Sequence, residues 1–418
     1  MAQKSIPDEL QLLREMCREG RLFDVQEWVR RGNPVALKLL PPRRNRRNGP
    51  LRIALDKGFH SLVQVLLEAG APIEEGDYHA LYHAVELSRQ DLVELLIQHG
   101  ASVQDVSMQT VIATWDRKLV DLFVANGANL IDDNPIAWGL VNDIRVALGV
   151  FKQYVGEYPE LRKQIDIALR YHADQGNAKW VALCLWAGAD PWSRGPDEAP
   201  DWDAPVYDLD NDEEDEDEDY LPTFRTAVEL AVLGGHREVL EQKKFLTAPD
   251  PSRPASMEFI EYIWWLRDSG IVQLLLVRGH KPTLYKDRCS CLITRLLSTL
   301  DRDIFESDRS GGGRRASRDV DSYRAQEQLK MIQLLISEGA LWKPKDKDEI
   351  KRVRQTLIQM APKYTYEFVQ MVHDHQAASR RDLEELVRTP TMVQILKRRS
   401  RQIPALIAGL PEELPTGA

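Results

Sequence analysis

The stretch that decides the fold is TAVELAVLGGHREVL, residues 226–240. Its apolar residues, among them Val228, Ala231 and Val232, follow the three-and-four spacing of one stripe along a helix. Glycine is favoured where the backbone must turn in the left-handed region, and a Gly-Gly pair interrupts the stripe. The stretch therefore predicts a helix and a tight turn leading into a second helix, with small Ala231 where the two approach closely.

A glycine followed by alanine, or by a residue in its place, recurs along the chain. The shortest intervals between these glycines are about thirty residues. Apolar runs with helical spacing precede them, for example VELLIQHGA at 93–101 and MIQLLISEGA at 331–340. We therefore expect each glycine to end a helix in a left-handed conformation. The pairs are Gly32-Asn33, Gly70-Ala71, Gly100-Ala101, Gly127-Ala128, Gly188-Ala189, Gly279-His280 and Gly339-Ala340.

Shorter helix-like runs come before several of these apolar runs. They include PLRIALDKGF at 50–59, ALYHAVELS at 80–88 and IALRYHADQG at 167–176. Ala54 and Ala84 occupy the same position in runs 50–59 and 80–88 as Ala231 occupies in residues 226–240. The repeating unit is thus predicted to be helix, tight turn, helix, glycine cap and loop.

These residues resemble the ankyrin repeat. TAVELAVLGGHREVL is similar almost position by position to the family pattern TPLHxAAxxGHxEVVxLLL, and WVALCLWAGADP at 180–191 is similar to the end of that pattern. Similar matches extend over roughly residues 8–340. This chain departs from the pattern where Arg52, Tyr82 and Glu229 replace the histidine that opens the first helix, and where Trp115 replaces a turn glycine.

The resemblance implies an all-α ankyrin-repeat solenoid of stacked helix-turn-helix units. We expect about nine repeats within residues 1–347, with 8–32 as an N-terminal cap. Residues 348–400 are interpreted as degenerate repeats or a helical C-terminal cap. The last segment, 401–418, is expected to trail off or to pack as a short strap.

Three insertions interrupt the period. The basic segment 38–50 carries Arg43, Arg44, Arg46 and Arg47 and is interpreted as a solvated loop or as a contact for an acidic partner or RNA. Residues 191–222 include the acidic run 208–219, which is expected not to fold alone because its charges repel one another. Residues 301–324 are expected to be a flexible loop. Within them Arg314-Arg315-Ala316-Ser317 resembles a site for a kinase that selects basic residues.

Composition and charge narrow the classes of function. A chain of 418 residues with 43% hydrophobic and 29% charged residues is typical of a folded protein. The formal net charge of −10 argues against a protein that binds by neutralising phosphates, and it favours a basic partner. Four scattered cysteines do not suggest a disulfide framework, and no apolar run is long enough for a membrane span. We therefore expect a cytoplasmic or nuclear protein that binds neither nucleic acid nor membrane.

Catalytic and metal-binding motifs are missing from the sequence. GxSxG, GxxxxGK[ST], GxGxxG after a strand and HExxH do not occur. Three close pairs that could suggest metal ligands are better explained as structural residues, because no third ligand follows at a useful spacing. The prediction is a non-enzyme without cofactor or metal. The pairs are His79 and His83, Cys289 and Cys291, and His373 and His375.

The function implied by the resemblance is protein binding, as an adaptor, scaffold or inhibitor. An alternative is a dedicated chaperone that shields a basic client, with the acidic run mimicking a polyanion; an enzyme with its site in an insertion is a weaker hypothesis. Tryptophans could anchor a partner or fill the core, and Trp192 is expected to be exposed; the other candidates are Trp138, Trp202, Trp264 and Trp265. The partner-binding residues expected from the repeat register are Glu74, Glu75, Asp77, Tyr78, His83, Asp105, Thr110, Asp132, Asp133, Tyr171 and Trp192.

Overall fold

The computed structural model separates the chain into two compact units, residues 1–168 and 169–418. In the described part of each unit, most residues lie in helices. The structure describes residues 10–36, 49–75, 78–196, 224–253, 256, 268–285, 292–294, 296–297, 314–359, 362–397 and 403–414.

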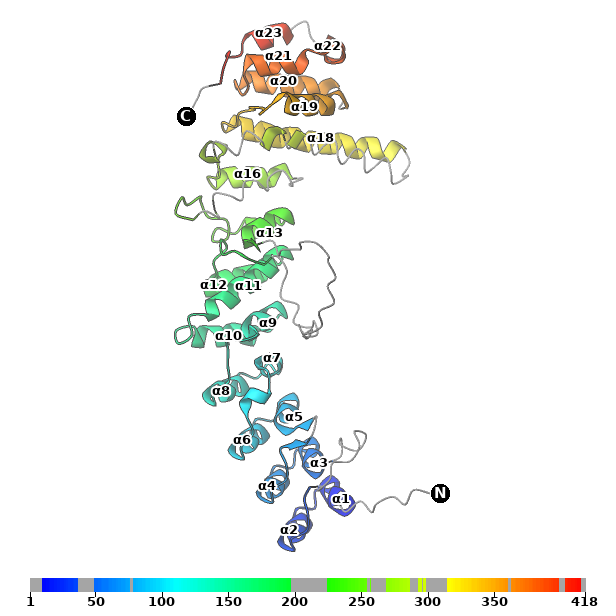
Figure 1. The fold of residues 1–418 in the computed structure, drawn as a ribbon, viewed down its shortest axis with the longest axis vertical. Coiled ribbons are helices and arrows are strands. Elements are labelled where there is room, and N and C mark those ends of the chain that lie inside the picture. The colour runs from blue at the N-terminus through cyan, green and yellow to red at the C-terminus, as the bar shows by residue number, and fades with distance from the viewer. Residues whose placement is uncertain are drawn as a thin grey trace, which may run out of the picture. The chain divides into compact units, whose positions relative to one another are not determined.

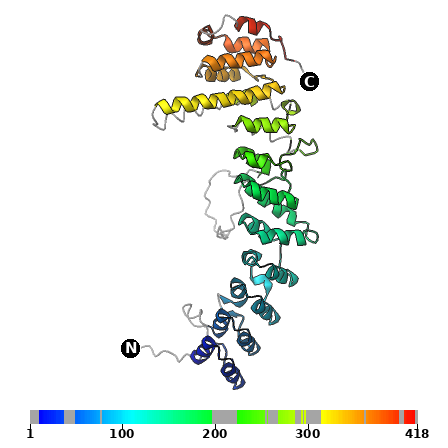
Figure 2. The same cartoon turned by 180° about the vertical axis from the view of Figure 1, so that it is seen from behind.

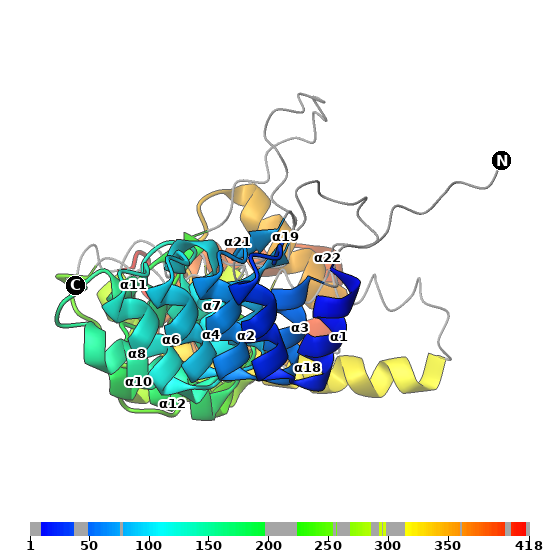
Figure 3. The same cartoon turned by 90° about the horizontal axis from the view of Figure 1, so that it is seen from below.

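The first unit is a stack of helix pairs (Figure 1). The first helices of the pairs, α1, α3, α5, α7 and α9, pack on one another in one layer, and α2, α4, α6, α8 and α10 pack in a second layer (Figure 3). The helices are α1 (Gln11–Glu19), α2 (Leu22–Arg30), α3 (Pro50–Lys57), α4 (His60–Glu68), α5 (Ala80–Glu86), α6 (Gln90–Gln98), α7 (Met108–Ala113), α8 (Arg117–Ala125), α9 (Pro135–Val141) and α10 (Arg145–Tyr154).

The second unit continues with helices of more varied length. Helix α11 (Leu161–Asp174) spans the boundary between the units. The helices that follow are α12 (Ala178–Ala187), α13 (Ala227–Leu233), α14 (Arg237–Leu240), α16 (Ser269–Val277), α18 (Arg314–Ser337), α19 (Lys347–Gln359), α20 (Pro362–Asp374), α21 (Arg380–Val387), α22 (Pro390–Lys397) and α23 (Ile403–Ala408). The 3₁₀ helices are η2 (Val103–Asp105) in the first unit and η4 (Pro282–Tyr285) in the second.

The recurring glycines end the helices as predicted. All seven have a positive φ, between 73° at Gly32 and 102° at Gly188, a region that costs least without a Cβ atom. The backbone amide after the glycine closes the turn onto the helix, as when Ala71 donates to the carbonyl of Leu66 at 2.9 Å. The repeat period seen in the sequence is therefore the period of these left-handed caps.

A second left-handed position lies in the turn between the two helices of a pair. Glycine fills it at Gly58, where φ is 68°, but Ser88, Trp115 and Asp143 occupy it with φ values of 53°, 60° and 62°. The family pattern has glycine at this position. Three consecutive units of this chain instead have a residue with a Cβ atom there, although the left-handed conformation is unfavourable for such residues. Trp115 is the largest of the three.

The core lies between the layers and is made of small residues and branched apolar ones. Ala54, Ala84 and Ala231 are completely buried, which confirms their predicted place at close helix contacts. Gly139 of α9 is packed so tightly that a Cβ atom built on it would lie 2.8 Å from the Cβ of Ala147. Larger side chains at these positions would force the helices apart.

The strands of the described chain form two short antiparallel pairs. In the first unit β1 (Glu74–Glu75) pairs with β2 (Tyr78–His79). In the second unit β3 (Gly195–Pro196) pairs with β4 (Phe224–Arg225) across the long insertion. Residues 197–223, which include the acidic run 208–219, lie outside the described residues. So do residues 38–48 of the basic segment 38–50.

The prediction of a flexible loop over 301–324 is wrong for its second part. Residues 314–324 form the beginning of α18, a continuous helix of 24 residues. The cause is compositional, because residues 314–337 contain neither glycine nor proline and consist largely of good helix formers, whereas Gly311, Gly312 and Gly313 directly precede them. Residues 301–313 lie outside the described part of the chain.

The C-terminal segment packs instead of trailing off. Helix α23 contacts α20 and α21, and Ile407 and Leu410 are buried. The backbone amide of Arg380 donates to the carbonyl of Pro411 at 2.8 Å. Residues 348–397 are helical in their described parts, as expected for degenerate repeats or a cap.

Candidate functional site

The candidate site in the first unit begins at the hairpin formed by β1 and β2. Glu74 is exposed and Tyr78 is half-buried. The guanidinium carbon of Arg52 lies 4.9 Å from the centre of the Tyr78 ring, close enough for a cation–π contact. Of the other expected residues here, Glu75 pairs with Tyr78 through its backbone, and Asp77 lies outside the described residues.

Helix α5 brings aromatic and acidic side chains together. His83 is half-buried, and its ring meets the Tyr78 ring edge-on with the centres 5.8 Å apart. The Nε2 atom of His83 contacts the carboxylate of Asp56 from α3, and its Nδ1 atom lies 3.7 Å from a carboxylate oxygen of Glu86. His83 is thus held by two acids within the protein, and it is less available to a partner than expected from the register.

Tyr82 directly precedes His83 in the chain and is the exposed aromatic residue of α5, with 41% of its surface accessible. Partial burial, with a further contribution from Glu86, raises the pKa of the Tyr82 phenol. The phenol therefore stays protonated at neutral pH and can donate a hydrogen bond. We call Asp56, Tyr82, His83 and Glu86 the α3–α5 cluster.

The remaining expected residues of the first unit lie on loops and on α7. Asp105, Asp132 and Asp133 are exposed, and Thr110 is half-buried. Asp132 accepts a hydrogen bond from the side chain of Asn129 at 2.6 Å, and the carbonyl of Asp133 accepts one from Gln109 at 3.0 Å. These contacts shape the loop before α9, and they leave carboxylates at its surface.

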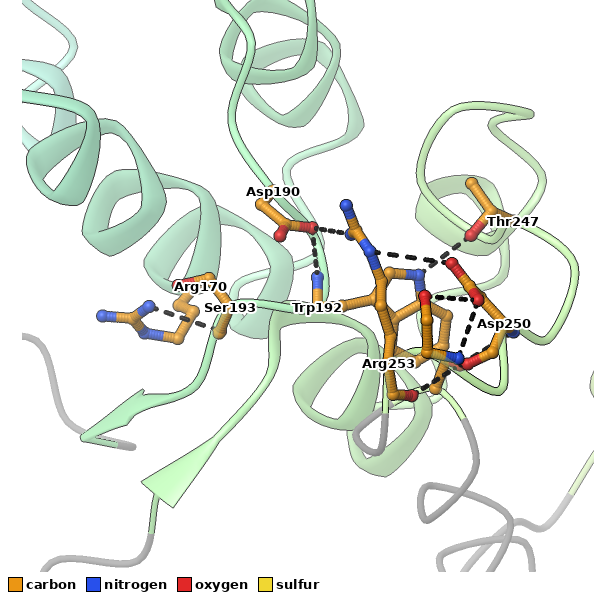
Figure 4. Close-up of polar contacts among 9 residues, drawn as sticks. Arg170, Asp190, Trp192, Ser193, Thr247, Asp250 and Arg253 are labelled. Atoms are coloured by element: carbon orange, nitrogen blue, oxygen red, sulfur yellow. Dashed lines mark hydrogen bonds and ion pairs between the residues drawn. The ribbon is translucent and has the colours of Figure 1, made fainter. Parts of the chain in front are cut away.

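Trp192 is not exposed, and that prediction is wrong. Only 5% of its surface is accessible, and its indole nitrogen donates to the Thr247 hydroxyl at 2.9 Å (Figure 4). Asp190 accepts from the Trp192 backbone amide at 3.1 Å and from Arg253 at 2.8 Å. The segment after α14, which includes Thr247, packs against the loop that carries Trp192 and covers the indole ring. The position of Trp192 after the glycine cap does not reveal this contact.

His280 completes this buried cluster. It occupies the place that alanine takes in most of the glycine pairs, and it is completely buried. Its Nε2 atom donates to the carbonyl of Thr247 at 2.8 Å, and its ring centre lies 6.1 Å from that of Trp192. Burial lowers the pKa of His280 to about 4, so the ring is neutral at physiological pH. The cluster joins the loop after α12 to residues 247–253 and to the end of α16.

Tyr171, the last expected partner-binding residue, is half-buried on α11. Its ring meets that of His172 at 5.3 Å, and His172 in turn stacks on Trp180 at the same distance. Tyr171 is therefore the outer end of a row of three rings.

Gly195 lies so near the guanidinium of Arg170, the residue before Tyr171, that an added Cβ atom would overlap it.

Glu229, at the position of the family's histidine, has a capping role. Its side chain accepts from the Thr226 amide at 2.7 Å, and its own amide donates to the Thr226 hydroxyl at 3.1 Å, which is a capping box. Burial raises the pKa of Glu229, while the cap and Arg194, 3.7 Å away, oppose that shift. Glu229 therefore replaces the histidine of the family pattern with a side chain that caps the N-terminus of α13.

The sequence reasoning missed the most exposed tryptophans among the described residues. Trp115 is 55% accessible in the turn between α7 and α8, and Trp186 is 61% accessible on α12. The signal for Trp115 was its place at a glycine position. Trp138 is half-buried, and Trp202, Trp264 and Trp265 lie outside the described residues.

In the described part of the chain, no three histidine, cysteine, aspartate or glutamate side chains lie close enough together to hold a metal ion. His79 is exposed, His83 belongs to the α3–α5 cluster, and His373 contacts Asp374 at 3.1 Å. Cys289 and Cys291 lie outside the described residues. None of the described helices has both the length and the apolar character needed to cross a membrane.

The fold places the chain in the class of helical-repeat proteins. Residues 25–107 match the family model of ankyrin repeats in three copies. The chain therefore contains ankyrin repeats at residues 25–107, and its described part is mostly helical. Ankyrin repeats are generally protein–protein interaction modules.

Comparisons with individual proteins cover smaller or more distant parts. A segment of 44 residues is 54% identical to human 2-5A-dependent ribonuclease, and it spans 10% of this chain and 6% of that protein's length. The ankyrin repeat domain of human ASB11 aligns with 44% of this chain and 86% of its own at 19% identity, with a TM-score of 0.32. The ankyrin repeat domain of Bcl-3, a member of the IkappaB family, aligns with 46% of this chain and 89% of its own at 17% identity, with a TM-score of 0.34.

Proposed function

We propose that this chain is a non-catalytic binding module, acting as an adaptor, scaffold or inhibitor, for a protein partner that carries basic and apolar groups. We further propose that it acts in the cytoplasm or nucleus, where its four scattered cysteines need no disulfide framework. The ankyrin repeats of residues 25–107 support protein binding as the general activity.

The observation that carries the proposal is the α3–α5 cluster. Tyr82 is an exposed aromatic residue with two exposed carboxylates, Asp56 and Glu86, on adjacent helices. Tyrosine is enriched among residues that contribute most to binding free energy at protein interfaces. Carboxylates around it attract lysine and arginine side chains and raise the rate of encounter. A basic segment with an apolar side chain for Tyr82 fits both features.

The charge of the whole protein acts in the same direction. The net charge of −10 favours approach of a positively charged partner over distances of about a Debye length, ~8 Å at physiological ionic strength. Trp115 offers a second exposed aromatic side chain in the same unit. The protein therefore combines long-range attraction of a basic partner with two exposed aromatic side chains, Tyr82 and Trp115, that could contact it.

Affinity capture followed by mass spectrometry identifies the partner, and titration calorimetry with the purified pair tests the site. Tyr82→Ala is expected to weaken binding at least tenfold, about 1.4 kcal/mol, because an aromatic side chain that the partner would bury is removed. Phe23→Ala is the matched control, since Phe23 is 81% accessible on α2 and belongs to the other layer. Equal loss in both variants, or no loss in either, would contradict the α3–α5 cluster as the binding site.

The acidic run 208–219 favours a second role, a chaperone that shields a basic client. In that role the run would replace a polyanion, and its deletion would abolish protection of the client against aggregation. For a module that binds through the α3–α5 cluster, the same deletion would lower only the association rate. Light scattering of the client and stopped-flow association kinetics separate the two roles.

A further inference from the structure

Helix α8 ends in an Asn-Gly pair. Within the described residues, Gly127 is the one glycine of positive φ that follows an asparagine, and its φ is 87°. Helix α8 packs on α7 and α10 inside the first unit, and Figures 1 and 2 show it from opposite sides. Asn126 and Gly127 are both exposed, so water has access to the pair.

An Asn-Gly pair is chemically reactive in water. The backbone nitrogen after the asparagine attacks the side-chain amide carbon, Cγ, and gives its proton to water. A bond between that nitrogen and Cγ forms as the bond from Cγ to Nδ2 breaks, and ammonia leaves with a proton taken from water. Water then opens the succinimide ring at either carbonyl and yields aspartate or isoaspartate. Glycine in the second position favours the attack because it has no Cβ atom to hinder it.

The closed end of α8 keeps the reacting groups apart. The Nδ2 atom of Asn126 donates to the carbonyl of Leu122 at 2.8 Å, so the side chain points back along the helix and away from the Gly127 nitrogen. The Gly127 amide donates to the carbonyl of Val124 at 3.0 Å. From the preceding loop, the side chain of Gln104 donates to the Gly127 carbonyl at 2.8 Å. The attacking nitrogen and the leaving amide are thus both held in other hydrogen bonds.

We propose that Asn126 is a site of spontaneous deamidation that reacts only when the last turn of α8 opens. Helix ends open at low free-energy cost compared with helix interiors, so a small fraction of molecules releases the pair at any moment. The rate in the folded protein is then the rate in an open chain multiplied by that fraction. This site is independent of the α3–α5 cluster.

The product keeps the end of the helix open. A carboxylate at position 126 has no N–H group to donate to the Leu122 carbonyl. Its charge also faces the negative end of the α8 dipole, which is unfavourable. Isoaspartate in addition lengthens the backbone by one carbon, which shifts the Ala128 amide away from the Phe123 carbonyl, to which it donates at 3.0 Å. Deamidation therefore turns a brief opening into a lasting one, next to the loop that precedes α9.

Asn142 at the end of α9 is a matched asparagine. Its Nδ2 atom donates to the carbonyl of Trp138 at 2.9 Å, the same bond four residues back that Asn126 makes. Its φ and ψ are −88° and 21°, close to the −96° and 14° of Asn126. The residue that follows it is Asp143, whose Cβ atom hinders attack by its backbone nitrogen. The two asparagines share their conformation and differ in the next residue.

The test of modification incubates the full chain at mildly alkaline pH and follows both asparagines by peptide mapping and mass spectrometry. A synthetic peptide of residues 119–132 is the open reference. Asn126 is expected to convert about ten- to a hundredfold more slowly in the folded chain than in the peptide. Asn142 should stay unmodified over the same time. Absence of product at Asn126 after a hundred half-times of the peptide, or equal product at Asn142, would overturn the site.

The dependence on opening is tested by weakening the closed cap. Gln104→Ala removes the hydrogen bond to the Gly127 carbonyl and is expected to raise the rate at Asn126 about two- to tenfold, the factor that one such bond contributes. Gln64→Ala, at an exposed glutamine of α4, should leave the rate unchanged. A rate in the parent equal to that of the peptide, or one that Gln104→Ala does not alter, would overturn the control by the cap.

The effect of the product is tested separately with Asn126→Asp, which supplies the aspartate form throughout the sample. Hydrogen exchange at the amides of Gly127 and Ala128 is expected to be at least twofold faster than in the parent, because the carboxylate disfavours the closed cap. Amides of α10 serve as the internal reference. Unchanged or slower exchange at these two amides would overturn the proposed opening even if Asn126 deamidates.

Discussion

The side-chain oxygen of Gln164 accepts a hydrogen bond from the backbone amide of Ile136 at 2.8 Å, so that a residue of α11 caps the start of α9. The same oxygen accepts from Ala137 at 3.2 Å, and the Gln164 amide donates to the carbonyl of Leu130 at 2.7 Å. Asn134, the local capping position, makes no side-chain cap hydrogen bond. One buried glutamine thus supplies from the next repeat what the helix lacks in its own sequence.

Gln164→Ala is expected to lower the free energy of unfolding by about 1 to 3 kcal/mol, because buried backbone groups lose their partners. Chemical denaturation followed by circular dichroism measures the change. Gln64→Ala on the exposed face of α4 is the control, with an expected change within about 0.5 kcal/mol. Similar stabilities of the two variants would show that Gln164 does not cap α9 in solution.

At position 115, glycine is expected to give a more stable protein than alanine. The φ of 60° at Trp115 disfavours any Cβ atom, so Trp115→Gly should be more stable than Trp115→Ala by about 1 kcal/mol. Both variants lose the indole equally, so their difference isolates the backbone. At Ala182, exposed within α12, glycine should instead be less stable than alanine by a similar amount. Thermal denaturation of the four proteins gives the comparison.

The features that repeat along the chain could be predicted from the sequence, and those that depend on a single distant contact could not. Gly188 was assigned as a left-handed cap because seven glycines share its surroundings, and its φ is 102°. Trp192, four residues later, was misplaced because Thr247, which binds it, is 55 residues away in a segment without repeat spacing. The cap from Gln164 likewise depends on contacts with residues 28 and 34 positions away, which the sequence does not indicate. In the candidate site, the register placed His83 on α5 but could not show that Asp56 and Glu86 hold it.

Ala231→Glu is expected to destabilise the second unit by several kcal/mol. Ala231 is completely buried at a helix contact of α13, and a carboxylate there would be desolvated without a partner. Ala182→Glu, at an exposed alanine of α12, carries the same change in charge and size and should alter stability by less than about 0.5 kcal/mol. Equal unfolding midpoints in denaturant would contradict the packing around α13.

His280 is expected to make the second unit sensitive to acid. Its folded-state pKa is about 4, below the ordinary value of 6.5, because burial disfavours the charged ring. The unfolded chain therefore binds the proton more readily than the folded chain. The stability contributed by neutral His280 is present above pH 6.5 and is lost as the pH falls toward 4, by about 3 kcal/mol in total.

Urea denaturation at a series of pH values between 7.5 and 4.5 tests this dependence in the parent and in His280→Ala. The variant restores the alanine found in most of the glycine pairs and loses the hydrogen bond to Thr247, so it should be less stable than the parent at pH 7.5. Its stability should then fall less steeply with acid, because the buried group that resists protonation is gone. His60→Ala, at an exposed histidine of α4, should retain the parent's slope. Parallel slopes for the parent and His280→Ala would show that acid acts on the second unit through other groups.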